Sequence, residues 1–517
     1  MKKINHFLIK NFELKPQEIN IFLLLFFHSF FLGLAGAFYF TPANSEFIRY
    51  FGSEQLPYAY IASGVGGYIF TTIYSWFQKR IGSRKLFTGT LVFMTLVTLA
   101  APILVGSINP KWLSFSVFIW AWPFLSMVGI ECGALSLKFL NLVQVKRIFA
   151  LFSMGGVLAA VIGYLVIPLL NKVLNHPYDL LYIAALGFLV GIVFLIMLYN
   201  KYPEKLVGEK KNITLKLKKE DKDNSISFLN LIKRDYFKYI FICAVISMTI
   251  IYVTDFSFLS TVKIHIAPDN VSQYLALVYG GLKIGEFIIS LFSNRLLSKY
   301  GVKLGLTILP MVSTAIVLLA AIVALFSGVE SIVFLVLMTI NKSQERILRR
   351  GLDDPAFNIL YQPLPDNEKF AVQTQVGVVM QFSIAIAGAF ILGVNTIISL
   401  GGGYNFKYFP LFFVPILIAW FISSRNLYLS YKDNIRQILA DISKEKRRDT
   451  SKNQYGSEMI RKYVKKGSKS ITNLAVTILS ETNPRSLEAL ASSLLESTDE
   501  VVNKAVLRNI DPTQRKR

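Results

Sequence analysis

The chain has 517 residues, 53% of them hydrophobic, with a positive mean hydropathy of +0.48. Many apolar segments of 18 or more residues exclude a wholly soluble protein and indicate an all-α polytopic membrane protein. The net charge of +23 could suggest nucleic acid, but most of the excess lies in short loops and a tail, which is typical of a membrane protein obeying the positive-inside rule. The cysteines Cys132 and Cys243 form no disulfide, zinc or redox pattern.

Twelve membrane-spanning helices are predicted in two groups of six. Their approximate ranges are 18–41, 57–78, 85–106, 112–140, 148–170, 179–200, 236–261, 272–297, 303–327, 329–351, 371–397 and 406–430. The first apolar run is too long for a signal peptide and no small-residue cleavage site follows it, so we expect a retained helix. The sequence therefore predicts four parts: a six-helix bundle over 1–200, a basic cytoplasmic linker over 201–235, a second bundle over 236–430 and a helical tail over 431–517.

Basic residues gather in the loops on one side of this arrangement. The loop residues with an expected gating or topological role are Arg80, Arg84, Lys146, Arg147, Lys299, Lys303 and Lys369. The opposite side carries isolated charges such as Lys111 and Lys263. Because basic loops stay in the cytoplasm, we expect both termini there. The lysine-rich linker is expected to lie near anionic lipid headgroups.

The two halves contain similar loop sequences. RIGSRKL begins at Arg80 after the second span, and KYGVKL begins at Lys299 after the eighth, 219 positions later. VKRIF contains Arg147 and NEKF contains Lys369, 222 positions later. Two matches at nearly one offset indicate duplicated six-helix halves, and transporters often carry their substrate site at such a repeat interface.

Twelve spans, a central linker and a basic glycine turn after the second and eighth spans resemble the major facilitator superfamily. The acidic residue usual in that turn is absent, and Lys79 lies near its place. KRIFALFSMGGVLAAVIG (146–163) and DDPAFNILYQPLPDNEKFAVQTQVG (353–377) are similar to ATP/ADP carrier-type nucleotide transporters, especially bacterial relatives with C-terminal HEAT repeats. This resemblance implies a nucleotide or other phosphorylated substrate and a bacterial inner-membrane location. The first span departs from those carriers, since His28 is its one ionisable residue within 22–40.

The tail has a soluble composition. Residues 431–448 continue the last span as a basic amphipathic helix, and apolar residues recur at helical spacing after Pro484 and after Asp499. Two such helices fit a HEAT-like hairpin. Because such repeats need about three units to bury a core, we expect the tail to dock on the membrane domain, on another copy or on a protein partner.

A charged stretch interrupts the apolar sequence at 341–377. Arg346 lies three residues before Arg349 and four before Arg350, so a helix places these arginines close together. Gly351 and the pair Asp354–Pro355 predict a helix C-terminus, a kink and a new N-cap. The arginines either line a transport pathway or form a cytoplasmic helix end that pairs with nearby carboxylates.

Other ionisable residues fall inside spans. In a facilitator-like arrangement the first, fourth, seventh and tenth spans line the cavity, and they contain His28, Glu131, Asp255 and the arginines. Glu131 and Asp255 could carry a coupling proton or pair structurally with a cation. His28 could titrate or simply pack through a hydrogen bond. Lys283 and Glu286, three apart in the eighth span, could satisfy each other.

These features predict a secondary transporter for a small anionic solute, working by alternating access. The candidate substrate-binding residues are Arg346, Arg349, Arg350, Glu131, Asp255, His28, Lys283 and Glu286. The alternative is a non-transporting scaffold or sensor whose tail binds a protein partner. No nucleophile–base pair, metal-ligand spacing or phosphate loop is visible, so we expect no enzyme activity, metal or cofactor, and lipid as the surrounding partner.

Overall fold

A computed structural model describes residues 16–140, 142–203, 234–364, 366–400 and 405–449. The chain divides into two compact units. The first contains residues 1–357 and 370–428, and the second contains 358–369 and 429–517. Both membrane halves belong to the first unit, which is the one that contains the candidate site. The linker of 204–233 and the HEAT-like tail beyond 449 lie outside the described residues, so the predicted four-part organisation stays a prediction.

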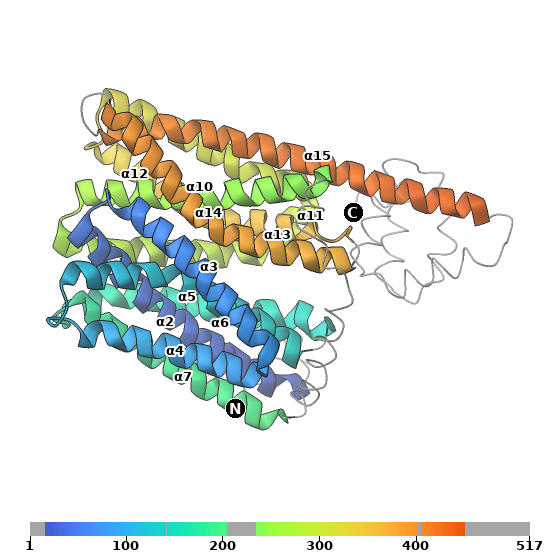
Figure 1. Cartoon of the computed structure of the whole chain (residues 1–517), viewed down its shortest axis with the longest axis horizontal. Coiled ribbons are helices and arrows are strands. Elements are labelled where there is room, and N and C mark those ends of the chain that lie inside the picture. The colour runs from blue at the N-terminus through green and yellow to red at the C-terminus, as the bar shows by residue number, and fades with distance from the viewer. Residues whose placement is uncertain (1–15, 141, 204–233, 365, 401–404, 450–517) are drawn as a thin grey trace. The chain divides into compact units, whose positions relative to one another are not determined.

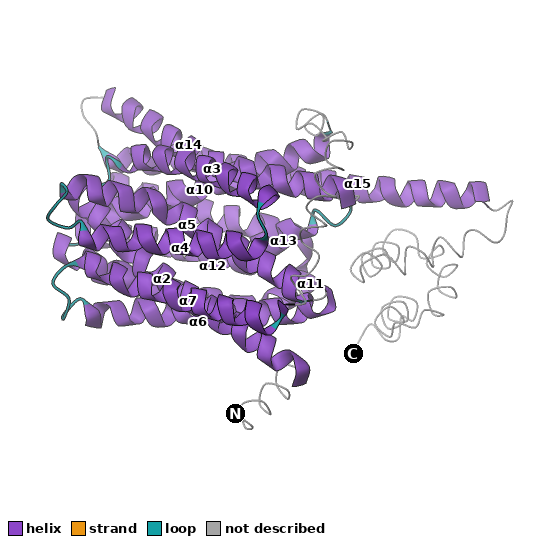
Figure 2. Ribbon diagram, turned by 60° about the horizontal axis from the view of Figure 1, so that its bottom comes forward, coloured by secondary structure: helices purple, strands orange, loops and turns teal. Residues whose placement is uncertain are grey.

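Six long helices form the first half of the membrane unit, and Figures 1 and 2 show how they are arranged. They are α2 (Ile19–Phe51), α3 (Leu56–Arg80), α4 (Ser83–Ile103), α5 (Pro110–Phe139), α6 (Leu142–Leu170) and α7 (Leu180–Lys201). Local sequence sets their ends. Gly52 ends α2 with φ 71°, which glycine adopts without steric cost. Asn109 caps α5 by accepting a hydrogen bond from the Lys111 amide, and Pro110 occupies the first helical position.

The second half completes the twelve spans. Its elements are α10 (Asp235–His265), α11 (Val271–Phe326), α12 (Ile332–Leu348), the π-helical turn η5 (Arg349–Asp353), α13 (Asp354–Ile359), α14 (Asp366–Leu400) and α15 (Phe409–Asp449). The long helix α11 contains the eighth and ninth spans, because Gly301 bends it with φ 77° and ψ 171°. The predicted all-α fold of two six-helix halves is therefore confirmed over the described chain.

Nine segments of the described chain have the length and apolarity to cross a membrane. The other three spans are α3, α6 and α12, which form long helices without meeting that criterion. α12 does not meet it because it has 17 residues and because Lys342, Glu345 and Arg346 are among them. These side chains are tolerated because α12 contacts α10 and α11, which shield it from lipid.

The predicted interruption is present as the π-helical turn η5, whereas the predicted helix end at Gly351 and the new N-cap at Asp354 are wrong. Gly351 lies inside η5, and Asp354 continues the helix with φ −58° and ψ −47° instead of capping a new one. Packing explains the glycine: a Cβ at Gly351 would lie 2.5 Å from Cγ1 of Ile289 on α11. Gly351 also accepts a hydrogen bond through its carbonyl from the Ser293 hydroxyl. The helix therefore continues through the wider π-helical turn into α13, which ends at Ile359.

The halves approach closely where α3 meets α14. A Cβ on Gly64 would lie 2.7 Å from the amide nitrogen of Ala385, and a Cβ on Gly388 would lie 2.5 Å from the carbonyl oxygen of Pro57. Small residues let membrane helices come into backbone contact in this way. On another side of the unit, α6 packs against α11, with Asn171 donating a hydrogen bond to Ser272 at 3.1 Å. These contacts lie toward the ends of the helices that the sequence places away from the cytoplasm.

Candidate functional site: a charged cavity between the halves

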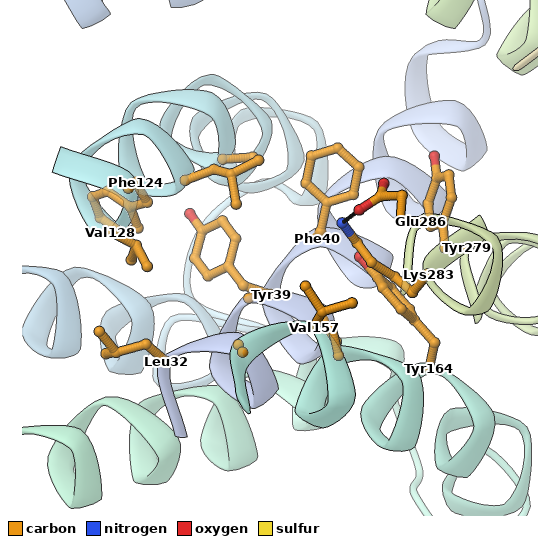
Figure 3. Close-up of a pocket in the computed structure, with 18 of the residues that line it drawn as sticks. Leu32, Tyr39, Phe40, Phe124, Val128, Val157, Tyr164, Tyr279, Lys283 and Glu286 are labelled. Atoms are coloured by element: carbon orange, nitrogen blue, oxygen red, sulfur yellow. Dashed lines mark hydrogen bonds and ion pairs between the residues drawn. The ribbon is translucent and has the colours of Figure 1, made fainter. Parts of the chain in front are cut away.

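A cavity of about 390 Å³ lies between the two halves of the membrane unit. Helices α2, α5 and α6 form one wall, and α11, α12 and η5 form the other. Aromatic rings from both walls border it, and Figure 3 shows them beside the Lys283–Glu286 pair. These rings belong to Tyr39, Phe40, Phe124, Tyr164 and Tyr279.

The charged part of the lining is mainly cationic and comes from the second half. It comprises Lys283, Glu286, Lys342, Arg346 and Arg350, which are four cations and one carboxylate. Lys283 donates a hydrogen bond to Glu286 at 2.7 Å, so this pair is neutral overall (Figure 3). The expected pairing of these two residues is therefore observed.

Arg346 extends toward the first half. Its guanidinium carbon lies 5.3 Å from the ring centroid of Trp122 on α5, a distance that permits a cation–π interaction. Its Nε lies 3.8 Å from Glu345, and about a quarter of the side chain (24%) remains exposed. Arg350 is also exposed and lines the same cavity. The structure thus places two of the three predicted arginines at the cavity.

Arg349 has a different environment. It donates to Glu345 at 2.6 Å, to Asp353 at 3.3 Å and to the hydroxyl of Ser247 on α10 at 2.7 Å. The side chain is 7% exposed and is not part of the cavity lining. Arg346 and Arg350 therefore line the cavity, whereas Arg349 pairs with neighbouring carboxylates. That the arginines line a transport pathway stays a prediction.

Asp255 lies behind the cavity wall in an ion pair with Lys342. The two side chains are 0% and 1% exposed. Tyr60, on α3 of the first half, donates a hydrogen bond to the other oxygen of Asp255 at 2.9 Å. Asp255 therefore links the seventh span, the tenth span and the opposite half, and its carboxylate is already occupied by two partners.

His28 and Glu131 meet within the first half. His28 Nε2 lies 3.8 Å from Glu131 Oε1, and both residues are buried. Neither belongs to the cavity lining, although the next residues in sequence, Ser29 and Cys132, do. A direct role in substrate binding for His28, Glu131, Asp255 or Arg349 stays a prediction.

The basic loop residues lie outside the cavity lining. Arg80 is exposed over Trp76, at 3.9 Å from the ring centroid, and Arg84 donates to Asn200 at 3.2 Å. Lys299 lies 5.2 Å from the centroid of Tyr300, and Lys303 is exposed. The side chains of Lys146, Arg147 and Lys369 are outside the described part of the structure. Their predicted gating role stays a prediction.

Sequence reasoning missed Lys342 and Tyr60. Lys342 had a detectable signal, because it precedes Arg346 by four residues and Arg349 by seven on a helix, and so extends the charged face. Tyr60 had none, since one tyrosine near the start of an apolar helix is unremarkable until the fold brings Asp255 to it.

Two halves of six helices around a central cavity, lined by apolar and aromatic residues with a cluster of charges, define a membrane transporter. The chain belongs to the Major Facilitator Superfamily, whose family model matches residues 21–344. No curated protein matches the sequence.

Solved structures support the same fold. A mutant of the nucleoside transporter NupG aligns with a TM-score of 0.56 at 14% identity, over 79% of this chain and 99% of that one. A POT family transporter in complex with 5-aminolevulinic acid gives 0.56 at 13%, over 80% and 96%. A bacterial homologue of the iron transporter ferroportin gives 0.54 at 13%, over 81% and 100%. At these identities the likeness establishes the fold, and the solute has to be argued from the cavity.

Proposed function

We propose that this protein transports a small organic anion by alternating access of its two halves, and that Arg346 and Arg350 bind the anionic group. The observation that carries the proposal is the cationic cavity wall. Lys342 and Lys283 are matched by Asp255 and Glu286, whereas Arg346 and Arg350 reach the cavity from one helix face. A guanidinium can donate two parallel hydrogen bonds to a phosphate or carboxylate.

The size and lining of the cavity favour a metabolite-sized solute. A volume of about 390 Å³ lies in the usual range for small-molecule sites, roughly 300–1,000 Å³. The tyrosine and phenylalanine rings suit a solute with a planar or apolar portion. The resemblance of 353–377 to ATP/ADP carrier-type proteins favours a nucleotide or another phosphorylated metabolite. The charge clusters support a bacterial inner-membrane location with both termini in the cytoplasm.

Transport and binding test this proposal directly. Purified protein should be stabilised by the true solute in a thermal-shift screen of nucleotides, sugar phosphates and dicarboxylates, because a ligand stabilises the folded state that binds it. The best stabiliser should then enter proteoliposomes in a protein-dependent way. If no anion stabilises the protein or enters the vesicles, the proposed substrate class is wrong.

The variant Arg346→Lys tests whether Arg346 binds the anionic group of the solute. Lysine keeps the charge but loses the two-pronged donation, so affinity should fall by about 10- to 150-fold, as expected for losing one hydrogen bond to a charged group. Arg80→Lys is the matched control, because Arg80 also stacks on a tryptophan but lies outside the cavity lining. An unchanged affinity in Arg346→Lys would exclude this arginine as the anion ligand.

A further inference from the structure

The hydrogen-bond partner of one ring nitrogen of His28 determines whether that nitrogen carries a hydrogen. Its Nδ1 lies 2.9 Å from the carbonyl oxygen of Gly191 on α7. A carbonyl can only accept, so Nδ1 carries a hydrogen and donates it. In the neutral ring the other nitrogen, Nε2, then has a lone pair and no hydrogen.

That lone pair faces a carboxylate oxygen. His28 Nε2 and Glu131 Oε1 are 3.8 Å apart, and neither atom has a hydrogen-bond partner in the described structure. The residues are 1% and 3% exposed. If His28 were neutral and Glu131 ionised, two buried acceptors would face each other without a donor, and a buried negative charge would lack a counter-ion.

One proton removes both problems. On Glu131 it makes a carboxylic acid that can donate to Nε2, and on His28 it makes an imidazolium beside a carboxylate. In either position the pair has zero net charge, which suits its burial.

The described groups around the pair do not supply a positive charge in place of that proton. Tyr74 on α3 and Tyr199 on α7 interact electrostatically with Glu131, but a phenol is neutral at physiological pH. Cys132, the next residue on α5, is also a neutral group. Arg84 on α4 is directed at the ring of Tyr199, at 5.7 Å, and its side chain is exposed. Lys138 lies two turns further along α5, about 10 Å at 1.5 Å per residue.

We propose that His28 and Glu131 together form a proton-binding site that holds one proton behind the cavity wall of the first half. The site lies next to Ser29 and Cys132, which line the cavity, so a proton could exchange with the cavity over a short distance. The proposal does not depend on which solute is transported, and it assigns the N-terminal half a chemistry separate from the arginines of the C-terminal half.

Infrared spectroscopy of the full-length protein in lipid nanodiscs near neutral pH tests the site. The spectrum of each variant is subtracted from that of the wild type. If Glu131 holds the proton, Glu131→Gln should remove a carboxylic-acid C=O band. If His28 holds it, His28→Gln should remove an imidazolium band in histidine-labelled protein. Glu286→Gln is the control and should leave both bands unchanged, because Glu286 is paired with Lys283. If both bands are the same in wild type, Glu131→Gln and His28→Gln, the proposal is wrong.

Stability gives an independent readout. Above about pH 7 an unfolded chain binds no proton on either side chain, so a folded site with one proton makes stability fall as pH rises. Glutamine at position 131 can donate its amide to Nε2 without a charge and mimics the loaded site. The melting temperature of Glu131→Gln should therefore vary less with pH than that of wild type. Equal pH dependence in the two proteins would contradict a bound proton.

Discussion

Lys342 and Asp255 form an ion pair that solvent does not reach, with 1% and 0% of their side chains exposed. Lys342 is on α12 and Asp255 is on α10, so the pair joins the tenth span to the seventh. Its position explains how two full charges persist inside a helix bundle: each is the counter-ion of the other, and Tyr60 donates to the remaining carboxylate oxygen.

Removing one member of this pair should be much more damaging than removing both. Asp255→Asn leaves the Lys342 ammonium buried without a counter-ion, which typically costs about 3–5 kcal/mol. Asp255→Asn combined with Lys342→Met removes both charges and should recover most of that loss. Melting temperatures of the wild type, both single variants and the double variant form the cycle that checks this. Strictly additive losses would mean that the residues are not coupled.

Tyr60→Phe should weaken the closure between the halves. It removes a hydrogen bond of 2.9 Å from the first half to a carboxylate of the second. Such bonds contribute roughly 1.5–3 kcal/mol. The equilibrium between conformations with the halves in contact and conformations with the halves separated should therefore shift toward the separated ones by about 10- to 150-fold. Spin labels at the exposed positions Tyr58 and Ile397 should report a longer distance in a cysteine-free background.

The control for that variant is Tyr39→Phe. Tyr39 donates at 3.0 Å to the carbonyl of Val117, and both residues belong to the first half. Its loss should leave the label distance unchanged. The same distance change in both tyrosine variants would show that the effect is not specific to the contact between the halves.

Gly388→Ala should also separate α3 from α14 at their close contact. The added methyl would lie 2.5 Å from the carbonyl oxygen of Pro57, which is backbone and cannot move aside cheaply. Gly393→Ala is a matched control on the same helix, because nothing lies within 4 Å of its added Cβ. The label distance should lengthen for Gly388→Ala alone. A label distance equal to that of the wild type would show that α3 and α14 accommodate the methyl group without separating.

Acid should weaken the turn that starts α7. Partial burial lowers the pKa of His176 below its usual value of 6.5, although Asp179 opposes the shift. The ring accepts a hydrogen bond from the Tyr178 amide in a capping box, and only an unprotonated nitrogen can accept. Because the unfolded chain binds this proton first, stability should fall as pH drops through the usual histidine range and below it.

His176→Asn keeps a capping acceptor that does not titrate. Its melting temperature should therefore decrease less than that of wild type on acidification, with His6→Asn as a control outside the described residues. If wild type and His176→Asn lose stability equally, this histidine does not contribute to the acid sensitivity.

The sequence was sufficient for the fold because lipid imposes strong length and polarity rules. Twelve apolar segments and the basic loops between them could be recognised without information on tertiary contacts. The helix α12 was also recognised despite its low hydropathy, because apolar spans precede and follow it in the sequence. The glycine turn at Gly301 was recognisable, whereas Gly351 was misread. Glycine in a sequence can indicate a left-handed turn or close packing, and only the position of Ile289 distinguishes them here.

The site was less predictable, because periodicity places residues on a helix face without saying what that face meets. The spacing of Arg346 and Arg350 predicted that they lie close together, and both line the cavity. The same spacing could not show that Arg349 turns to Ser247 on another helix. The pairing of His28 with Glu131 depends on two helices separated by more than one hundred residues, which no local pattern encodes.

The charge content of α12 has a consequence for how the protein is made. Each lysine, arginine or carboxylate near the centre of a helix raises the cost of membrane insertion by roughly 2.5–3.5 kcal/mol, and α12 contains Lys342, Glu345 and Arg346. During synthesis α10 emerges first, so Asp255 is already available when Lys342 arrives. Insertion of the tenth span therefore depends on the seventh, and loss of Asp255 alone should lower the fraction of chains in which α12 inserts, before any transport cycle begins.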